Sequence, residues 1–165
     1  MINVEVTEKS IKELVDERTV SVVIQGCNCF HTTTGVISDS LRDLTSGDID
    51  RVDAEGSVRG DINKLGNWTS ELYTLAGQEV EIYNLYCEFI HLDLLFVVEQ
   101  ESIHWSSVYD GIEKILSKCE SGTVVAVGMV GYTDTQQETF QETLEELAKE
   151  NDNELPDVDI IIFER

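Results

Sequence analysis

The segment Val22-Val-Ile-Gln-Gly-Cys-Asn-Cys-Phe-His31 carries the clearest indication of the fold. It begins inside a short β-branched run, 20–24, of the kind that forms a strand buried in a sheet. It ends in a polar turn that carries an amide, two thiols and an imidazole. Ligands of open α/β sheets bind at the carboxyl ends of strands. We therefore expect a binding site where this loop, 26–36, meets a second polar loop at 131–137.

Strand patterns alternate with helix patterns on both sides of this stretch. Apolar periodicity predicts further strands at 2–6, 79–89, 94–98, 123–130 and 158–163. It predicts helices after the cap residue Thr7, at 36–44, from about 107 to 119 and from about 136 to 150. The segment 45–66, rich in glycine and acids, is expected to be irregular surface chain. This order predicts a single α/β domain over residues 1–165, with helices covering both faces of a sheet.

The strand predicted at 79–89 shows how the two faces of the sheet differ. Because side chains alternate along a strand, one face receives Val80, Ile82 and Asn84 and the other receives Tyr83, Leu85 and Cys87. This alternation predicts a strand.

Charge is the unusual feature of the composition. The 165 residues include 33 Asp and Glu but only 11 Lys and Arg, which gives a formal net charge of -22. Such a surface repels nucleic-acid phosphates and anionic lipids, so we expect no direct nucleic-acid or membrane binding. The amino terminus lacks a secretion-signal pattern, and no apolar run approaches the ~18 residues of a membrane span. We expect a cytoplasmic protein whose four cysteines are reduced thiols.

Three kinds of chemistry compete for the turn at 26–31. The first is a metal site, because thiolates and imidazoles ligate metals and the turn contains Cys27, Cys29 and His31. Further candidate ligands are Cys87, His91, His104 and Cys119. No C-x-x-C or H-x-x-x-H pair accompanies the C-x-C pair of the turn, so no metal site is predicted. The second interpretation is a cysteine nucleophile activated by His31. Cysteines that only pack in the core as small buried thiols are commoner than catalytic ones. The third gives Asn28 a hydrogen bond to a ligand hydroxyl, and its rival is an Asx turn that only holds the loop.

The quoted stretch resembles the opening motif of the macrodomains with a Gly-Cys-Asn-Cys-Phe signature, the branch linked to ADP-ribose 1″-phosphate phosphatases and small viral macro proteins. Gly60-Asp-Ile-Asn-Lys-Leu-Gly66, Ile82-Tyr-Asn-Leu-Tyr86 and Val127-Gly-Met-Val-Gly131 are similar to later segments of that branch, in the same order. The helix from Ser107 to Leu116 occupies the place of the family's central helix. The resemblance implies a three-layer α/β/α fold with a mixed central sheet.

The resemblance also implies a ligand, ADP-ribose or a related nucleotide, and no cofactor. In the family, the counterpart of Asn28 contacts the distal ribose, and two glycine-rich loops bring backbone N–H groups onto the pyrophosphate. Carried over to this chain, the catalytic candidates are Asn28, His31 and Asp134. The ligand-binding candidates are Gly26, Cys27, Asn28, Thr33, Thr34, Gly35, Val36, Gly131, Tyr132 and Thr133.

Both phosphate loops depart from the family pattern. The first reads Thr32-Thr-Thr-Gly-Val-Ile37 and the second Gly131-Tyr-Thr-Asp-Thr-Gln-Gln137, so each keeps one glycine, and the bulky Tyr132 enters the second. Asp134 lies one position before the catalytic acid of some ADP-ribosyl hydrolases of the superfamily. Lost backbone contacts forfeit charge-assisted hydrogen bonds worth roughly 1.5–3 kcal/mol each. We expect weak nucleotide binding, with phosphatase or ADP-ribosyl hydrolase activity slow or absent.

The charge supports an alternative function. Four acids in the last predicted helix, Glu138, Glu142, Glu146 and Glu150, recur at i, i+4 spacing and form a surface of one sign. A degenerate macro fold could present this surface to a basic protein partner, in the manner of a nucleic-acid mimic. Its rival is an acidic surface that serves solubility alone.

Overall fold

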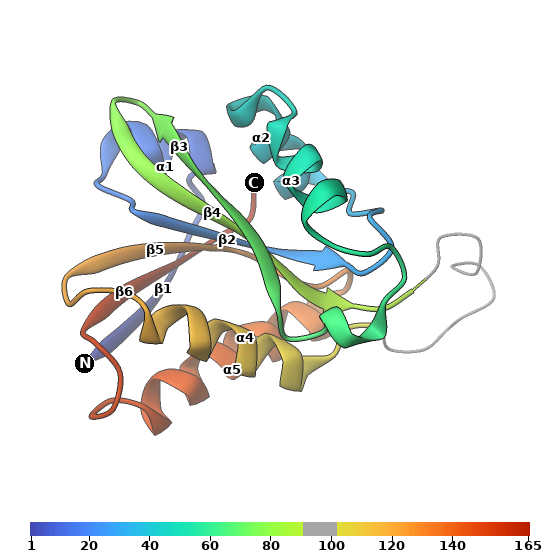
Figure 1. Cartoon of the computed structure of the whole chain (residues 1–165). Coiled ribbons are helices and arrows are strands. Elements are labelled where there is room, and N and C mark those ends of the chain that lie inside the picture. The colour runs from blue at the N-terminus through green and yellow to red at the C-terminus, as the bar shows by residue number, and fades with distance from the viewer. Residues whose placement is uncertain (91–101) are drawn as a thin grey trace.

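The computed structural model describes residues 1–90 and 102–165 and contains a six-stranded sheet (Figure 1). The strands stand in the order β1-β6-β5-β2-β4-β3, with neighbours parallel except for β3, which runs antiparallel to β4. Their bounds are β1 Ile2–Thr7, β2 Val22–Asn28, β3 Trp68–Leu75, β4 Gln78–Glu88, β5 Thr123–Gly128 and β6 Val158–Phe163. The sheet is therefore mixed, as predicted, and the carboxyl ends of β2, β4, β5 and β6 lie at one edge.

Helices cover both faces of this sheet, as Figure 1 shows, with α1 to α3 on one side and α4 and α5 on the other. Their bounds are α1 Ile11–Glu17, α2 Val36–Thr45, α3 Asp48–Gly56, α4 Trp105–Ser117 and α5 Asp134–Glu150, with a short 3-10 helix, η1, at Ile62–Lys64. The predicted three-layer α/β/α fold is confirmed.

Successive side chains of β4 point to opposite faces of the sheet and pack in two different apolar cores. Val80 and Ile82 pack with α1, α2 and α3 in one core, whereas Tyr83, Leu85 and Cys87 pack with α4 and α5 in the other. This is the division that the sequence predicts. Asn84 is a fully buried polar residue on the first face, and Glu88 is a second buried polar residue at the end of the strand.

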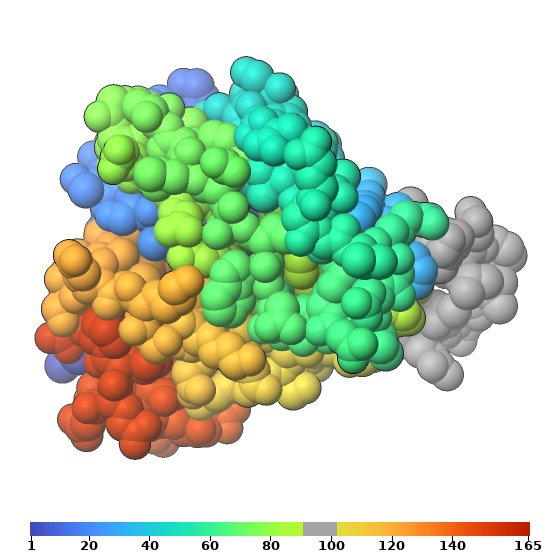
Figure 2. All heavy atoms as spheres, viewed as in Figure 1, coloured from blue at the N-terminus to red at the C-terminus, as the bar shows by residue number. Residues whose placement is uncertain are grey.

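Three elements were not predicted from the sequence, namely α3, η1 and β3. The segment 45–66 is not irregular throughout, because it contains α3 and η1, and Ile49 and Val52 bury one side of α3 against the sheet. Figure 2 shows its teal and green atoms as part of a continuous surface. Strand β3 was missed because it lies at the sheet edge and most of its side chains are partly or fully exposed, which weakens the alternating pattern. The strand predicted at 94–98 lies outside the described residues.

Smaller differences concern element ends. β5 stops at Gly128, two residues before the predicted end, and α4 starts at Trp105 rather than near Ser107. In the part of the chain that the structure describes, no helix combines the length and apolar character needed to cross a bilayer.

Candidate functional site

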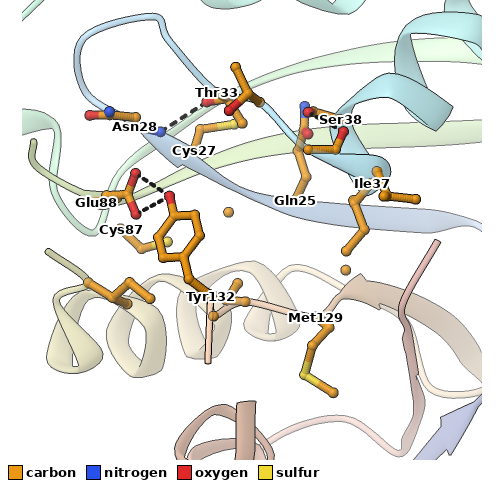
Figure 3. Close-up of a pocket in the computed structure, with 18 of the residues that line it drawn as sticks. Gln25, Cys27, Asn28, Thr33, Ile37, Ser38, Cys87, Glu88, Met129 and Tyr132 are labelled. Atoms are coloured by element: carbon orange, nitrogen blue, oxygen red, sulfur yellow. Dashed lines mark hydrogen bonds between the residues drawn. The ribbon is translucent and has the colours of Figure 1, made fainter. Parts of the chain in front are cut away.

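A cavity of about 400 Å³ opens at the carboxyl ends of β2, β4 and β5 (Figure 3). It lies where α/β sheets place their ligands, between the two polar loops. The end of β2 forms its floor and the start of α2 one wall, and the chain after β5 closes the opposite side. Its lining residues belong to 25–28, 33–38, 87–88, 128–132, Ile103, Gln137 and Glu164.

The cavity gathers the predicted ligand-binding residues except Thr133. Gly26, Cys27, Asn28, Thr33, Thr34, Gly35, Val36, Gly131 and Tyr132 all line it. Of the three catalytic candidates, only Asn28 lines it. Gln25, Ser38, Glu88 and Glu164 line the cavity as well and were not predicted.

The Asn28 side chain is held by its own loop and by the chain after β4. It is 2% exposed, and its Nδ2 donates to Thr32 Oγ1 at 3.0 Å and to the carbonyl of Ile90 at 2.7 Å. Its Oδ1 accepts from the backbone N–H of Phe30 at 3.3 Å and of Ile90 at 3.4 Å. The bond to Phe30 is an Asx turn, the second of the two roles that the sequence leaves open. A ribose hydroxyl would have to share or replace these bonds.

His31 lies away from the cavity and joins a buried polar cluster beneath α3. With a φ of 58°, it turns the chain so that its Nε2 lies 2.8 Å from Ser57 Oγ and 3.7 Å from Asp53 Oδ1. Burial lowers the pKa of His31, although the nearby Asp53 carboxylate opposes this shift. The imidazole therefore favours its neutral form.

The second loop ends in a well-capped helix. Thr133 is the N-cap of α5 and forms a capping box with Gln136, so its hydroxyl serves the helix. Asp134 follows as the first helical residue and is exposed. Gly131 has a φ of 135°, and a Cβ there would lie 2.9 Å from the backbone nitrogen of Gln137. The surviving glycine is therefore required by the helix start.

Tyr132 connects the two sides of the cavity mouth. Its hydroxyl donates to the Glu88 carboxylate, with oxygen–oxygen distances of 2.7 and 2.5 Å, and Figure 3 shows the ring extending from the chain after β5 toward Glu88. The residue is 65% exposed, whereas Glu88 is buried. Burial raises the pKa of Glu88. The hydrogen bonds from Tyr132 and Ser102 lower this pKa, but the effect of burial is larger. Tyr132 thus narrows the mouth but leaves the cavity open.

Acids are the charged groups of this site. Glu88 and Glu164 line the cavity, and no lysine, arginine or histidine does so among the described residues. Donors for a ligand must come from hydroxyls, side-chain amides and backbone N–H groups. The first turn of α2 supplies such groups, since its N-cap, Gly35, has no capping side chain and the first N–H groups of a helix lack partners within it.

The thiols near the site are buried and protonated. Burial raises the pKa of Cys29 to about 11 and that of Cys87 to about 12, and it also raises the pKa of Cys27. A thiol is nucleophilic only as the thiolate, so these environments disfavour a cysteine nucleophile. In residues 1–90 and 102–165, no three His, Cys, Asp or Glu side chains are grouped to hold a metal ion. His91 lies outside that part.

We expect the Glu88→Gln substitution to change how stability depends on pH. The folded-state pKa of Glu88 is raised above its ordinary value of 4.5, so this carboxyl group ionises at a lower pH in the unfolded protein than in the folded protein. The stability of the fold therefore decreases as the pH rises from the unfolded-state pKa to the folded-state pKa. Glutamine keeps an acceptor for Tyr132 without the charge. Thermal melts from pH 4.5 to 7 should therefore favour the variant increasingly as the pH rises.

The Tyr132→Phe variant should shift the same measurement the other way. It removes a donor that stabilises the Glu88 carboxylate, so stability should fall more steeply with pH than in the wild type. Parallel pH profiles for all three proteins would contradict a buried, titrating Glu88.

Comparison with solved structures shows that the chain has the macrodomain fold. The macrodomain of Mycobacterium tuberculosis DarG matches with a TM-score of 0.58 and 13% identity, over 100% of this chain and 98% of that one. A macrodomain protein from Streptomyces coelicolor gives 0.60 and 10% identity, over 100% and 99%. The Oceanobacillus iheyensis macrodomain, solved with MES bound, gives 0.55 and 10%, over 96% and 82%.

Neither the protein-family models nor the curated proteins that were searched match this sequence. The predicted macrodomain-like fold is confirmed by the solved structures. At identities of 10–13% they establish the fold alone.

Proposed function

We propose that this protein binds ADP-ribose or a related nucleotide in the cavity between the two loops, with weak or no hydrolysis. The observation that carries the proposal is the cavity itself, which lies at the carboxyl ends of the strands of a macrodomain fold. Its volume of about 400 Å³ falls within the range of small-molecule sites, about 300–1,000 Å³.

Donors for a phosphate come from the wall formed by α2. Val36, Ile37 and Ser38 line the cavity and form the first turn of this helix. The N-terminus of a helix favours anions, because its free N–H groups and its dipole both point at them. The hydroxyls of Thr33 and Thr34, also in the lining, add polar groups beside this turn.

Two features weaken the binding of an anion. Glu88 and Glu164 share the cavity with the ligand, and the protein carries a net charge of -22. Both repel a diphosphate, and salt screens the long-range part of that repulsion. Affinity for ADP-ribose should therefore rise with ionic strength, the reverse of the usual behaviour of phosphate-binding proteins.

Hydrolysis is disfavoured by where the catalytic candidates lie. His31 faces Ser57 and Asp53 under α3, and Asp134 lies at the start of α5 outside the cavity lining. The Asn28 amide is held by its loop. A general base has to reach the reacting water or hydroxyl within hydrogen-bond distance, and these positions do not place one in the cavity.

Calorimetric titration of a matched pair of variants tests the proposal. Val36 and Val58 are both exposed valines, at 62% and 68%, but only Val36 lines this cavity. We expect Val36→Glu to weaken ADP-ribose binding at least tenfold, because a carboxylate in the first turn of α2 stabilises the helix while repelling the ligand. Val58→Glu adds the same charge away from the cavity and should change affinity less than threefold.

Phosphate release from ADP-ribose 1″-phosphate should be slow or absent, close to the level of a protein-free control. The binding proposal fails if wild-type protein at high concentration gives neither heat nor a thermal shift with ADP-ribose. The expectation on catalysis fails if phosphate is released in the presence of the wild-type protein and not in that of the Asn28→Ala variant.

A further inference from the structure

One buried polar atom in the cavity wall is left without a partner. In residues 1–90 and 102–165, Gln25 Oε1 is the one buried side-chain nitrogen or oxygen that makes no hydrogen bond. Gln25 is 5% exposed and lines the cavity. Figure 3 shows it rising from β2 on the side where α2 begins. Buried acceptors are almost always paired, so this exception calls for a donor.

The orientation of the Gln25 amide follows from its neighbours. Its Nε2 donates to Asn84 Oδ1 at 2.7 Å, and Asn84 in turn uses its Nδ2 on Thr69 Oγ1 at 3.1 Å and on the carbonyl of Ile49 at 3.5 Å. A reversed Gln25 would place two oxygens against each other. The nitrogen therefore faces Asn84, and the oxygen is left without a partner in a residue that lines the cavity.

This hydrogen-bond chain continues to a carboxylate. Thr69 Oγ1 lies 3.0 Å from the Tyr86 hydroxyl, which donates to Asp53 Oδ1 at 2.6 Å. Each of these groups is buried, so the chain holds Asn84, and through it Gln25, in one position. The acceptor at Gln25 is therefore preorganised.

The nearest hydroxyl of α2 is already occupied. Ser38 Oγ donates to the carbonyl of Gly35 at 3.1 Å and accepts from Arg42 at 3.4 Å. It has no second proton to offer to Gln25. The first-turn N–H groups of α2, in contrast, offer donors to a ligand beside the Gln25 acceptor.

We propose that Gln25 is a specificity-determining residue, whose Oε1 accepts a hydrogen bond from an uncharged donor of the ligand, a hydroxyl of the distal sugar or a base amino group. An anion is unsuited to this position, because a carbonyl oxygen repels it and Glu88 and Glu164 line the same cavity. A hydroxyl or an amino group suits it, since each can donate to Gln25, while the first-turn N–H groups of α2 serve the phosphate of the same ligand. The inference rests on the proposed function and names which part of a nucleotide this end of the cavity binds.

Affinities of two proteins for three ligands test this proposal. The proteins are wild type and Gln25→Met, which keeps the length of the side chain but removes its acceptor. The ligands are ADP-ribose, its analogue with hydrogen in place of the base amino group, and ADP, which lacks the distal ribose. Wild type should bind one of the two reduced ligands about tenfold more weakly than ADP-ribose, because its buried acceptor is then left unpaired. The ligand that is rejected identifies the base or the distal sugar as the donor.

Gln25→Met should bind ADP-ribose about tenfold more weakly than wild type. It should no longer distinguish ADP-ribose from the reduced ligand that wild type rejects. The matched control is Gln141→Met, the same substitution on α5 at a residue that lies outside the cavity lining and whose side chain contacts Glu145, and it should retain the discrimination. If Gln25→Met does not fold, Gln25→Asn, which withdraws the amide by one methylene, takes its place. Undiminished discrimination in the Gln25 variant overturns the inference alone, whereas no binding of any ligand to wild type overturns the proposed function and the inference together.

Discussion

The Asp53→Ala substitution should destabilise the protein by about 3–5 kcal/mol, the range for removing one partner from a buried charged network. Asp53 is buried in α3 and accepts the Tyr86 hydroxyl at 2.6 Å. Lys64 is also buried, with its Nζ 2.8 Å from the carbonyl of Cys29 and 4.3 Å from the centre of the Tyr86 ring. Burial lowers the pKa of Lys64, and Asp53 is the foremost charge that opposes this. Without Asp53 the ammonium and the hydroxyl both lose a favourable partner.

Urea unfolding at pH 7 measures this effect, with Glu55→Ala as the control. Glu55 belongs to the same helix, but its carboxylate is exposed and pairs with Arg51 at 2.9 Å, and such surface pairs contribute about 0–1 kcal/mol. Asp53→Asn, which keeps an acceptor but removes the charge, should fall between the two. Equal losses for Asp53→Ala and Glu55→Ala would show that the buried cluster is not a main source of stability.

The Asn28→Ala substitution should cost about 2–4 kcal/mol and abolish ligand binding. It removes four hydrogen bonds and leaves the N–H groups of Phe30 and Ile90 without their acceptor. Each buried group left unpaired costs about 1–3 kcal/mol. The binding loss alone would therefore not identify Asn28 as a ribose contact, because the loop that forms the cavity wall would also change.

Hydrogen exchange separates these two causes. In Asn28→Ala without ligand, amide protection should fall in the loop 28–33, which a pure ligand contact would leave unchanged. The control is Asn67→Ala, an exposed asparagine whose side chain makes one bond, to the carbonyl of Asn63 at 3.0 Å; we expect it to cost less than about 1 kcal/mol. If Asn28→Ala loses ligand binding but keeps the amide protection of the loop 28–33, Asn28 contacts the ligand directly.

Most of the sheet could be predicted because its strands carry an unambiguous pattern. The runs at β2, β5 and β6 are buried on both faces, and such runs stand out against the polar loops. In α3, by contrast, Ile49 and Val52 are the only large apolar residues, and the glycines and acids around them favour a loop. Its stability comes from tertiary packing, which local propensity does not report.

The cavity was located from the sequence, but its chemistry was not. Strand ends indicated the two loops, and the resemblance indicated Asn28. The turn at His31 could not be foreseen, since a φ of 58° is an uncommon state for a residue with a side chain and sends the imidazole toward α3. The roles of Gln25 and Glu88 depend on which partners Asn84 and Tyr132 provide, and those residues lie 59 and 44 positions away in the sequence.

Since β6 runs parallel to its neighbours, its two ends lie at opposite edges of the sheet and offer unequal places for a label. Glu164 lines the cavity, so a fluorophore attached at Arg165 would be one residue from the cavity lining. Met1 is ion-paired with Asp157 at the opposite edge, roughly 20 Å away across a six-residue strand. Immobilisation through Met1 leaves the cavity mouth free for binding measurements, whereas a dye at the carboxyl end would report directly on ligand entry.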